Sequence, residues 1–295
     1  MNTIKYSFII ATHNRNDDLQ KCLSSIEKAH VRSQENKIEI IVVFNGENCE
    51  KSTLNTKDPI LFKVYEIAEP GLSKARNFGI ARSSGEYLVF IDDDATVKED
   101  FVHVLNKCTI SMKEKAFCGK ILGLDGEACF SDIYMNNKIK YLGWYDQEYF
   151  RGSAHVVKKC LMEEIGGYNE KFGVGGKYCG AEDADLFFRL KQAKENIVYV
   201  PEMVFYHPLL EGFSSLKAYK YSYANGAVLI KQVLCDKIHF YIYCRIMLKE
   251  LMQRTYGLLR NILFPKLMRN KNQKWQYNAA FSGMNMGIID YIRFK

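Results

Sequence analysis

Three consecutive aspartates follow a short apolar run in YLVFIDDDATV, residues 87–97. Carboxylates this close repel one another, so a fold alone gains nothing from the arrangement. Hard cations such as Mg²⁺ and Mn²⁺ take oxygen ligands, commonly one or two carboxylates together with substrate phosphates. Because alternate side chains of an extended chain point the same way, Asp92 and Asp94 can face one site while Asp93 faces elsewhere. The triplet predicts a metal and phosphate site; the alternative is a solvated turn before a helix.

A second acidic pair, Glu182-Asp183, opens the segment EDADLFFRLKQA, whose apolar spacing predicts a helix over 182–193. Acidic residues are favoured at a helix N-terminus, so capping is the ordinary explanation of the pair. A carboxylate is also a suitable general base for removing a proton from a hydroxyl group. Asp185 points round the helix from Asp183 and is the weaker candidate for that role.

The elements that must position these acids alternate between strands and helices. Apolar runs predict strands at 7–11, 38–44, 63–67, 87–91 and 116–122, and helical spacing predicts helices from Asn16 or Asp17, at 72–84 and at 98–108. Such alternation implies right-handed βαβ units and a mostly parallel sheet, whose ligands bind outside the carboxyl ends of the strands. Polar clusters stand at those ends: Thr12 to Arg15, Asn45-Gly46 and Asp92 to Asp94.

The rest of the chain is less regular until its C-terminal part. Residues 123–180 are rich in glycine and aromatic residues and predict loops with short strands, whereas 196–207 predict one or two strands. From Ser214 the pattern is helical to about Leu263. Residues 231–295 hold 12 Lys/Arg and 3 Asp/Glu, a net charge of +9 against +7 for the whole chain. This asymmetry favours a basic C-terminal part that faces an anionic surface.

Composition sets the remaining bounds. With 295 residues, 47% of them hydrophobic, the chain suffices for one large domain or two modest ones. Its nine cysteines contain no CxxC pair, which argues against a zinc ribbon and a disulfide framework and favours a reducing, cytosolic compartment. We find neither a signal-peptide layout nor an apolar run of 18 residues, so the sequence predicts no spanning helix.

Four segments together resemble the family 2 glycosyltransferases with the GT-A fold. They are SFIIATHNR, IIVVFNG, PGLSKARNFGIARSSGEYLVFIDDD and GGYNEKF…GAEDADLFFRL, in the family's order between residue 7 and about residue 207. The resemblance implies an α/β, Rossmann-like central sheet, mostly parallel and flanked by helices. It places the GT-A catalytic domain at 1–210, with nucleotide-sugar binding in 1–122 and the acceptor side in 123–210. A basic helical extension at 211–295 follows.

The same resemblance assigns residues to the donor. An aspartate pair spaced by one residue holds metal and nucleotide-sugar in the family, which corresponds here to Asp92 and Asp94 with Mn²⁺ or Mg²⁺. His207, at the end of VFYH, matches a histidine that completes the metal shell in many GT-A enzymes; a structural histidine is the alternative. The nucleotide-binding candidates are Thr12, His13, Asn14, Arg15, Asn45, Gly71, Ser73, Arg76, Asn77, Asp92 and Asp93.

Two of these residues leave alternatives open. Asn45 stands where relatives often carry an aspartate that reads the base; its amide can still hydrogen-bond a base edge, and uracil stays favoured. Arg76 either pairs with the acids or the base, or it only anchors Asp92 or a neighbouring loop. Lys74 lies in the same helix after Gly71.

On the acceptor side, the resemblance makes Asp183 the base that deprotonates the acceptor hydroxyl, with Glu182 binding the acceptor or orienting the site. Trp144, Arg151 and Gly152 lie in the loop before this pair and are candidates for contact with the acceptor or the donor sugar. Aromatic rings stack on sugars, although the neighbouring Trp-Tyr pair is more often simply core.

The segment FYIYCRIMLKELMQRTYGLLRNILF, residues 240–264, mixes apolar residues with Arg245, Lys249, Arg254 and Arg260. Such a segment is unsuited to span a bilayer but can lie in the interface, apolar side inward and cations toward headgroups. The alternatives are a helical hairpin packed on the catalytic domain and a homo-oligomer interface. No nucleic-acid-binding motif accompanies the basic residues, so a nucleic-acid partner is not expected.

The sequence thus predicts an inverting, metal-dependent glycosyltransferase that uses a nucleoside diphosphate sugar, with a UDP-sugar favoured. The expected acceptor is a saccharide or a lipid-linked saccharide in bacterial surface-polysaccharide biosynthesis, such as capsule or lipopolysaccharide. The expected location is the cytoplasm, with peripheral contact to the inner face of the cell membrane as an option. Two rivals stay open: a sugar-phosphate nucleotidyltransferase, and a non-catalytic protein that binds nucleotide-sugars or acts as a scaffold.

Overall fold

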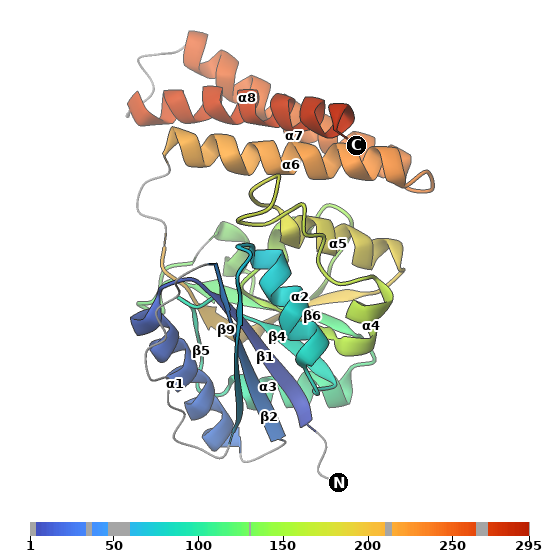
Figure 1. Cartoon of the computed structure of the whole chain (residues 1–295). Coiled ribbons are helices and arrows are strands. Elements are labelled where there is room, and N and C mark those ends of the chain that lie inside the picture. Colours follow the sequence, from blue (N-terminus) through green and yellow to red (C-terminus); the bar gives the residue numbers. More distant parts are fainter. Residues whose placement is uncertain are drawn as a thin grey trace. The chain divides into compact units, whose positions relative to one another are not determined.

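The computed structural model describes residues 4–33, 37–46, 60–129, 131–209, 214–263 and 271–294 (Figure 1). The chain divides into two compact units. The first comprises Met1–Glu170 and Leu186–Leu209, and the second comprises Lys171–Asp185 and Leu210–Lys295. Each unit is described by itself below.

The first unit contains a single sheet in the spatial order β3-β2-β1-β4-β8-β6-β9-β5, with β7 paired to β9. Strands β3, β2, β1 and β4 pair with one another in parallel, as the βαβ pattern predicts. Strand β8 is antiparallel to both β4 and β6, and β9 is parallel to β6 but antiparallel to β5 and β7, so the sheet as a whole is mixed. The strands are β1 Ile4–Thr12, β2 Lys37–Asn45, β3 Leu61–Ile67, β4 Tyr87–Phe90, β5 Thr96–Val97, β6 Ala116–Leu122, β7 Lys140–Tyr141, β8 His155–Lys158 and β9 Ile197–Tyr206.

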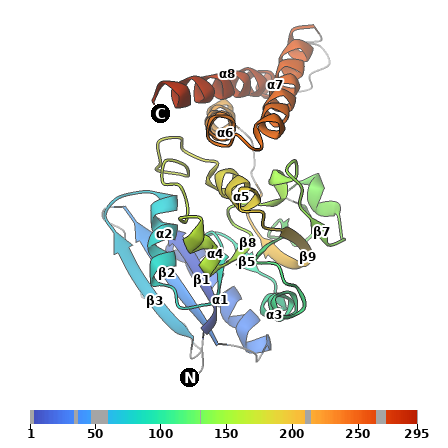
Figure 2. The same ribbon diagram turned by 90° about the vertical axis from the view of Figure 1, so that its right-hand side faces the viewer.

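Helices flank this sheet and confirm the predicted α/β fold. The chain passes from β1 through helix α1 to β2, and from β3 back through α2 to β4 on the other side of β1. Because both crossovers are right-handed, α1 and α2 cover opposite faces (Figure 2). The helices are α1 Asn16–Ser33, α2 Leu72–Arg82, α3 Phe101–Ser111, α4 Lys159–Glu164 and α5 Glu182–Gln192.

The reversal of direction at β1 and β4 determines where ligands can bind. In an open α/β sheet, the crevice lies outside the carboxyl ends of the two strands at which the connections diverge. β1 ends at Thr12, and Asp92 stands two residues after the end of β4. The registered pairs of β1 with β4 run from Tyr6 with Tyr87 to Ile9 with Phe90, so both carboxyl ends meet at one edge. The fold therefore places both predicted polar clusters at this crevice.

Strand β8 brings a buried histidine into the core beside the crevice. The imidazole of His155 lies between the rings of Phe90 and Phe150, at centroid distances of 4.9 and 4.5 Å. Its Nδ1 is 2.8 Å from the Arg151 carbonyl oxygen, and its Nε2 is 2.6 Å from the Tyr168 hydroxyl. Burial, reinforced by the nearby charge of Arg76, lowers the pKa of His155 to about 3. The ring is therefore neutral at pH 7 and fixes the turn that precedes β8.

The second unit is built from three long helices, α6 Ser215–Cys235, α7 Phe240–Leu263 and α8 Lys271–Arg293. The first two confirm the helical pattern predicted after Ser214. Helices α6 and α8 approach backbone to backbone through glycines. A Cβ at Gly287 would press on the Tyr223 carbonyl oxygen, one at Gly283 on the Tyr219 carbonyl, and one at Gly226 on the Met284 carbonyl. Small residues at these three positions are thus a condition for the pairing of α6 with α8.

We expect Gly287→Ala to destabilise the protein. In an isolated helix, alanine would gain up to about 1 kcal/mol over glycine. Here the added methyl group meets a carbonyl oxygen of α6, and overpacking of this kind costs about 1–3 kcal/mol. Urea unfolding followed by circular dichroism measures the resulting change in the free energy of unfolding. Ser282→Ala, at an exposed position of the same helix, is the matched control and should change stability by less than about 0.5 kcal/mol. A Gly287→Ala variant as stable as the control would contradict this packing.

We also expect acid to destabilise the first unit through His155. The folded pKa lies below that of the unfolded chain, so the unfolded state binds more protons and stability is lost as pH falls from about 6.5 toward 3. By pH 5 this loss amounts to about 2 kcal/mol. In His155→Gln that part of the pH dependence should vanish, which urea unfolding at pH 7 and pH 5 would show. His103→Gln, at an exposed position of α3, should keep the wild-type slope; equal slopes in all three proteins would refute the assignment.

Candidate active site

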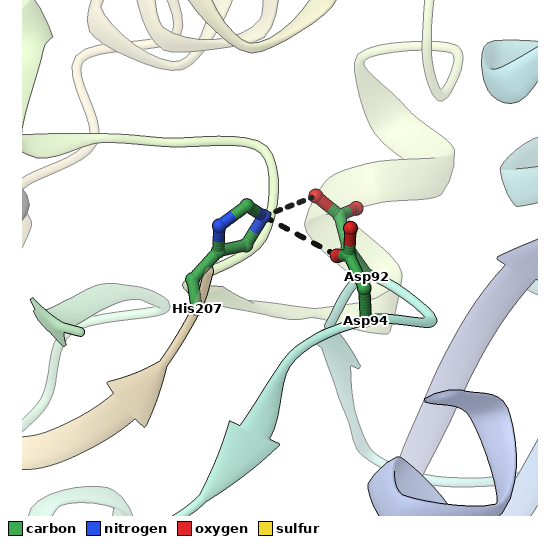
Figure 3. Close-up of side chains that lie close together, drawn as sticks. All are labelled: Asp92, Asp94 and His207. Carbon is green, nitrogen blue, oxygen red and sulfur yellow. Dashed lines mark ion pairs between the residues drawn. The ribbon is translucent and has the colours of Figure 1, made fainter. Parts of the chain in front are cut away.

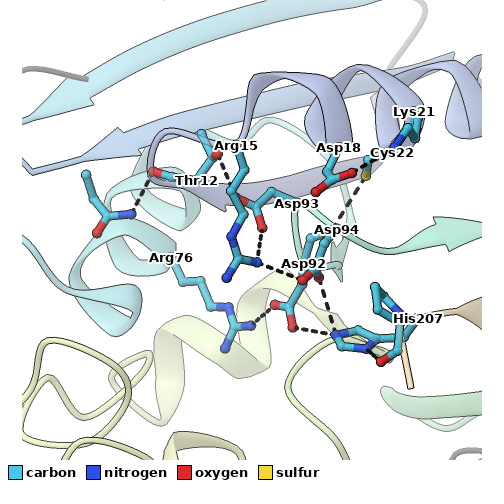
Figure 4. A network of polar contacts seen from close by, with 12 residues as sticks. Thr12, Arg15, Asp18, Lys21, Cys22, Arg76, Asp92, Asp93, Asp94 and His207 are labelled. Carbon is cyan, nitrogen blue, oxygen red and sulfur yellow. Dashed lines mark hydrogen bonds and ion pairs between the residues drawn. The ribbon is translucent and has the colours of Figure 1, made fainter. Parts of the chain in front are cut away.

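The three aspartates that follow β4 take different partners, shown in Figure 4. Asp93 is buried; its carboxylate accepts a 2.7 Å hydrogen bond from the Thr12 hydroxyl and lies 3.3 Å from Nη1 of Arg15. Burial raises the pKa of Asp93 to about 6, aided by the charges of Asp94 and Asp92 and opposed by Thr12 and Arg15. Asp93 thus takes its partners from the end of β1. Asp93 and Asp94 lie in a turn in which the Ala95 N–H donates to the Asp92 carbonyl at 3.1 Å, so the different directions of the three side chains arise from this turn and not from the extended chain that the sequence predicted.

Asp92 and Asp94 face His207, which follows the end of β9 (Figure 3). Nε2 of His207 is 3.3 Å from Oδ1 of Asp94 and 3.8 Å from Oδ2 of Asp92. One ligand atom from each residue lies within 4.8 Å of the other two. Oδ1 of Asp94 is buried and, apart from this ion pair with His207, makes no hydrogen bond among the described residues. Two carboxylates and an imidazole with an oxygen left over fit a divalent cation such as Mn²⁺ or Mg²⁺.

Electrostatics keep this cluster charged. Burial opposes ionisation of Asp92, but the interactions with His207 and Arg76 outweigh it and lower the pKa of Asp92 to about 2. Burial likewise disfavours the charged imidazole of His207, yet the adjacent Asp92 and then Asp94 raise its pKa. Asp92 is therefore ionised at neutral pH, as a metal ligand must be, whereas His207 would have to give up its proton to bind a cation.

Arg76 of α2 is the cation that holds Asp92. Its side chain is 1% exposed, and Nη2 donates to Oδ1 of Asp92 at 2.8 Å and to the Gly152 carbonyl at 2.9 Å. The guanidinium also lies over the ring of Tyr168, 5.3 Å from its centroid. Of the alternatives left open by the sequence, the structure shows Arg76 pairing with an acid and anchoring the loop that contains Gly152.

Arg15 is the second cation of the site and is more exposed. Its Nη1 donates to Oδ2 of Asp94 at 2.7 Å as well as contacting Asp93, while about half of its side chain remains accessible. His13 and Asn14 precede it in the same turn; Nδ1 of His13 is 2.6 Å from the Asn45 carbonyl, and Asn14 has a positive φ of 53°. The turn after β1 is thus fixed against β2 and against the aspartates.

The structure gives Asn45 a use that an aspartate could not fulfil. Its Nδ2 donates to the Thr12 carbonyl at 2.9 Å, and its Oδ1 accepts from the Gly71 backbone N–H at 3.1 Å. Only an amide offers both a donor and an acceptor. Asn45 therefore connects the ends of β1 and β2 to the start of α2, where Gly71 has φ 154°.

Two further candidates lie on α2. Ser73 is buried in its first turn. Asn77 does not face the aspartates: its amide donates to the Tyr168 carbonyl at 2.9 Å and to Glu170 at 3.0 Å, and accepts from the Tyr168 backbone N–H at 2.8 Å. These bonds show that Asn77 fixes the chain after α4.

The sugar-binding candidates are placed differently from one another. Arg151 and Gly152 join the aspartate network, through the Gly152 carbonyl that accepts from Arg76 and the Arg151 carbonyl that faces His155. Nε of Arg151 is buried and meets no hydrogen-bond acceptor in the part of the chain that the structure describes. Trp144 lies half-buried in the loop after β7.

The acidic pair Glu182-Asp183 forms the first turn of α5, as predicted, and belongs to the second unit together with the preceding loop. Oδ1 of Asp183 accepts from the Ala184 backbone N–H at 2.8 Å. Cys179 and Ala181, directly before the pair, have positive φ of 57° and 59°. Non-glycine residues adopt this conformation at a cost, which is often borne near functional sites.

Sequence reasoning missed three residues that support these side chains: His155, Tyr168 and Lys231. Their partners are distant in sequence, since His155 meets Tyr168 across a turn and Lys231 pairs with Asp185 from another helix. A buried histidine in an otherwise apolar strand, HVVK, was the available signal for the first of them.

Comparison with known proteins supports the resemblance seen in the sequence. Residues 7–119 match the family model described as Glycosyl transferase family 2. The chain is 24% identical over 231 residues to Glycosyltransferase GlyA of Streptococcus pneumoniae, which covers 70% of this chain and 31% of that protein. It is 29% identical over 188 residues to the GalNAc(5)-diNAcBac-PP-undecaprenol beta-1,3-glucosyltransferase of Campylobacter jejuni, covering 57% of this chain and 56% of the relative. The matches thus span under two thirds of both relatives.

Solved structures show the same fold. S. aureus TarS 1-349 in complex with UDP-GlcNAc aligns with a TM-score of 0.64 at 14% identity, covering 98% of this chain and 92% of that one. The mannosyltransferase PcManGT from Pyrobaculum calidifontis, in complex with GDP-Man and Mn2+, aligns with a TM-score of 0.66 at 13% identity, covering 98% and 87%. At these identities the likeness shows the GT-A architecture alone.

The family match includes the turn after β1, strand β2, helix α2 and the aspartate triplet, which are the elements that assemble the polar network of Figure 4. The resemblance inferred from those segments is confirmed. The segment 7–119 belongs to glycosyltransferase family 2, and the relatives that the chain matches over a longer stretch are named glycosyltransferases.

Proposed function

We propose that the protein transfers a sugar, with inversion, from a nucleoside diphosphate sugar to a hydroxyl group of a saccharide. The observation that carries this proposal is the cluster of Asp92, Asp94 and His207 at the switch point of the sheet. A site for a divalent cation at that point suits a diphosphate, because carboxylates and phosphate oxygens can share one hard cation. We assign the catalytic domain to residues 1–210 and the basic helical extension to 211–295.

Asp92, Asp94 and His207 would hold Mn²⁺ or Mg²⁺, which supplies positive charge to offset that of the departing diphosphate. Arg15 is the protein's own cation at the same place: it reaches Asp94 and remains half accessible, so its guanidinium can also donate to phosphate oxygens. Thr12 and Asp93 keep the turn after β1 in position beneath it. Arg76 donates to both Asp92 and the Gly152 carbonyl and so fixes the position of the Asp92 carboxylate relative to the loop that contains Gly152.

The nucleoside pocket, in this proposal, is formed by His13, Asn14, Asn45, Gly71 and Ser73. We favour uracil as the base. The amide of Asn45 is held by two backbone groups and keeps hydrogen-bonding capacity for a base edge. The UDP-GlcNAc complex of TarS supports this choice by fold, while the GDP-Man complex of PcManGT makes guanine the comparison to test.

We assign Asp183 as the base that takes the proton of the acceptor hydroxyl, with Glu182 orienting the acceptor. An inverting transfer is a single displacement at the anomeric carbon, so one carboxylate near the attacking hydroxyl suffices. Trp144, Arg151 and Gly152 are the proposed contacts for the sugars.

A lipid-linked saccharide of cell-surface polysaccharide biosynthesis is the proposed acceptor. The Campylobacter relative, by its name, acts on an undecaprenol-linked substrate. Among the described residues, no helix combines the length and apolarity needed to cross a bilayer. Helix α7 buries Tyr243 on one side. On the opposite side it exposes a stripe of large apolar residues, namely Tyr241, Leu248, Met252, Tyr256, Leu259 and Leu263. With Arg245 and Lys249 exposed beside it, this stripe suits an anionic membrane surface.

Asp92→Asn and Asp183→Asn should separate binding from chemistry. Asp92→Asn should abolish the Mn²⁺-dependent part of UDP binding, because the cation loses a carboxylate ligand. Asp183→Asn should bind UDP as the wild type does but lose transfer by about 10²–10⁴-fold. Calorimetric titration with UDP in Mn²⁺ or EDTA gives the first result, and sugar release from UDP-sugars with acceptor gives the second.

The control for these variants is Glu99→Gln, an exposed carboxylate of the same unit, whose loss should leave both measurements unchanged. Wild-type binding of UDP at about 100 times its Kd should raise stability by about 2.7 kcal/mol. If UDP bound equally well in EDTA and in Mn²⁺, the assignment of the metal site would be refuted. A fully active Asp183→Asn variant would refute the assignment of Asp183 as the base.

Membrane contact should depend on α7. The protein should sediment with vesicles that contain phosphatidylglycerol and remain in solution with phosphatidylcholine vesicles, and salt should weaken binding by screening the cations. Leu248→Glu with Met252→Glu should abolish sedimentation, since both side chains are exposed on the stripe. Ile110→Glu, at an exposed apolar position of α3, is the control. If the stripe instead joins two copies of the chain, the double variant will change the mass measured by light scattering.

A further inference from the structure

Helix α6 contains a lysine that reaches the first turn of α5. Asp185, the last acid of EDAD, is fully buried, and its Oδ1 pairs with Nζ of Lys231. Nε2 of Gln232 is 3.4 Å from the same oxygen. The side chain of Lys231 is only 14% exposed, so both charges of the pair are largely removed from water. This pair lies within the second unit and is separate from the aspartates after β4.

Burial makes the pair obligatory. A buried carboxylate that loses its partner is strongly destabilising, so Asp185 keeps Lys231 as long as the unit is folded. The backbone N–H of Asp185 also donates to the Ala181 carbonyl at 3.0 Å, within the first turn of α5. A movement of Asp185 therefore moves that turn, and the pair fixes the turn to α6.

The loop before α5 is attached to the same helices by aromatic contacts. The ring of Phe172 lies 5.9 Å from Nζ of Lys231 and stacks on Tyr178 at 4.9 Å. Tyr178 in turn meets Tyr223 of α6 at 6.0 Å and Tyr291 of α8 at 5.8 Å. Lys231 thus contacts both ends of the segment 171–185.

Between these two attachments the backbone is strained. Cys179 and Ala181 adopt left-handed conformations immediately before Glu182, which non-glycine residues adopt at a cost. Such conformations persist only where the surroundings determine them. Here the Cys179 N–H donates to the Gly176 carbonyl, the Gly173 N–H donates to the Gly180 carbonyl, and the Asp185 N–H donates to the Ala181 carbonyl; the contacts of Lys231 and Tyr178 attach this segment to α6 and α8. The direction in which Glu182 and Asp183 leave the loop depends on this backbone.

We propose that Lys231 is a positioning residue that acts through Asp185 to fix the loop 171–185 and, with it, the orientation of the Asp183 carboxylate. The inference rests on the proposed function, in which Asp183 is the base. Lys231 itself touches no substrate in this scheme. Its ammonium holds the buried carboxylate two residues after Asp183, and this sets the helix turn from which Asp183 projects.

Hydrogen exchange tests the attachment without any enzymatic assay. In Lys231→Met, amides of 171–185 should exchange at least about tenfold faster than in the wild type, whereas those of α2 should be unchanged. Lys231→Arg keeps the charge and should restore protection. Lys220→Met, at an exposed position of α6, is the matched control and should behave as the wild type. Unchanged exchange in 171–185 of a folded Lys231→Met overturns the proposal, whether or not transfer is measurable.

Steady-state kinetics tests the effect on Asp183. Lys231→Met should lower kcat by about tenfold to a hundredfold, because small displacements of a catalytic group have effects of this size. The donor KM should remain within about twofold, and Lys231→Arg should recover kcat. An unchanged kcat, or a donor KM that rises together with the loss of thermal stability, would show a purely structural role.

The double variant Asp185→Asn with Lys231→Met covers the case in which the single variant does not fold. Replacing both partners removes the unpaired charge, so thermal stability should return. The neutral side chains no longer form the ion pair, so kcat should stay at least about tenfold below wild type. Recovery of kcat together with stability would refute the positioning role. If the wild-type protein transferred no sugar from any nucleotide-sugar donor, the proposed function would be refuted instead. The hydrogen-exchange result would still show whether Lys231 fixes the segment 171–185.

Discussion

Mutual repulsion of three adjacent carboxylates is the constraint that organises the first unit. Each aspartate after β4 is stabilised from a different direction: Asp92 by Arg76 of α2, Asp93 by Thr12 at the end of β1, and Asp94 by Arg15 and His207. These partners come from widely separated segments, which only the sheet order brings together. The same arrangement leaves Oδ1 of Asp94 buried with an ion pair to His207 but no hydrogen bond among the described residues, so the repulsion of the acids and the proposed cation site have a common origin.

The topology explains why the partners converge. Because the connections from β1 and from β3 run in opposite directions, the carboxyl ends of β1 and β4 are open to ligands. Asn45 and the buried Arg76 then tie α2 to both strand ends, the first through backbone groups and the second through Asp92. Neutral His155 holds the next loop from the core side. The polar groups at this edge are thus supported from the interior of the sheet and leave their outer atoms for a ligand.

Much of this could be read from the sequence, because it depends on local pattern. Apolar runs predicted β1, β2, β4 and β6, helical spacing predicted α1, α2 and α5, and the aspartate triplet indicated a cluster of acids that could hold a cation. The features that the sequence did not predict depend on contacts between residues that are distant in the chain. The four residues of β8 are too few to show a period, and Lys231 looks like any helical lysine until α6 is placed beside Asp185. Periodicity reports which face of an element is buried, but not which residue it meets.

The glycine contacts between α6 and α8 also bear on the order in which the protein matures during synthesis. The metal-site residues, from Asp92 to His207, emerge before any of the three long helices. The segment 171–185 emerges with them, but its partners do not: Tyr291 belongs to α8, which can pack against Gly226 only after the residues of α8 have been made. Since domains fold as units in the order of their synthesis, a nascent chain would gain its cation site first. The acidic turn of α5 would reach its final geometry last, on arrival of the final helix.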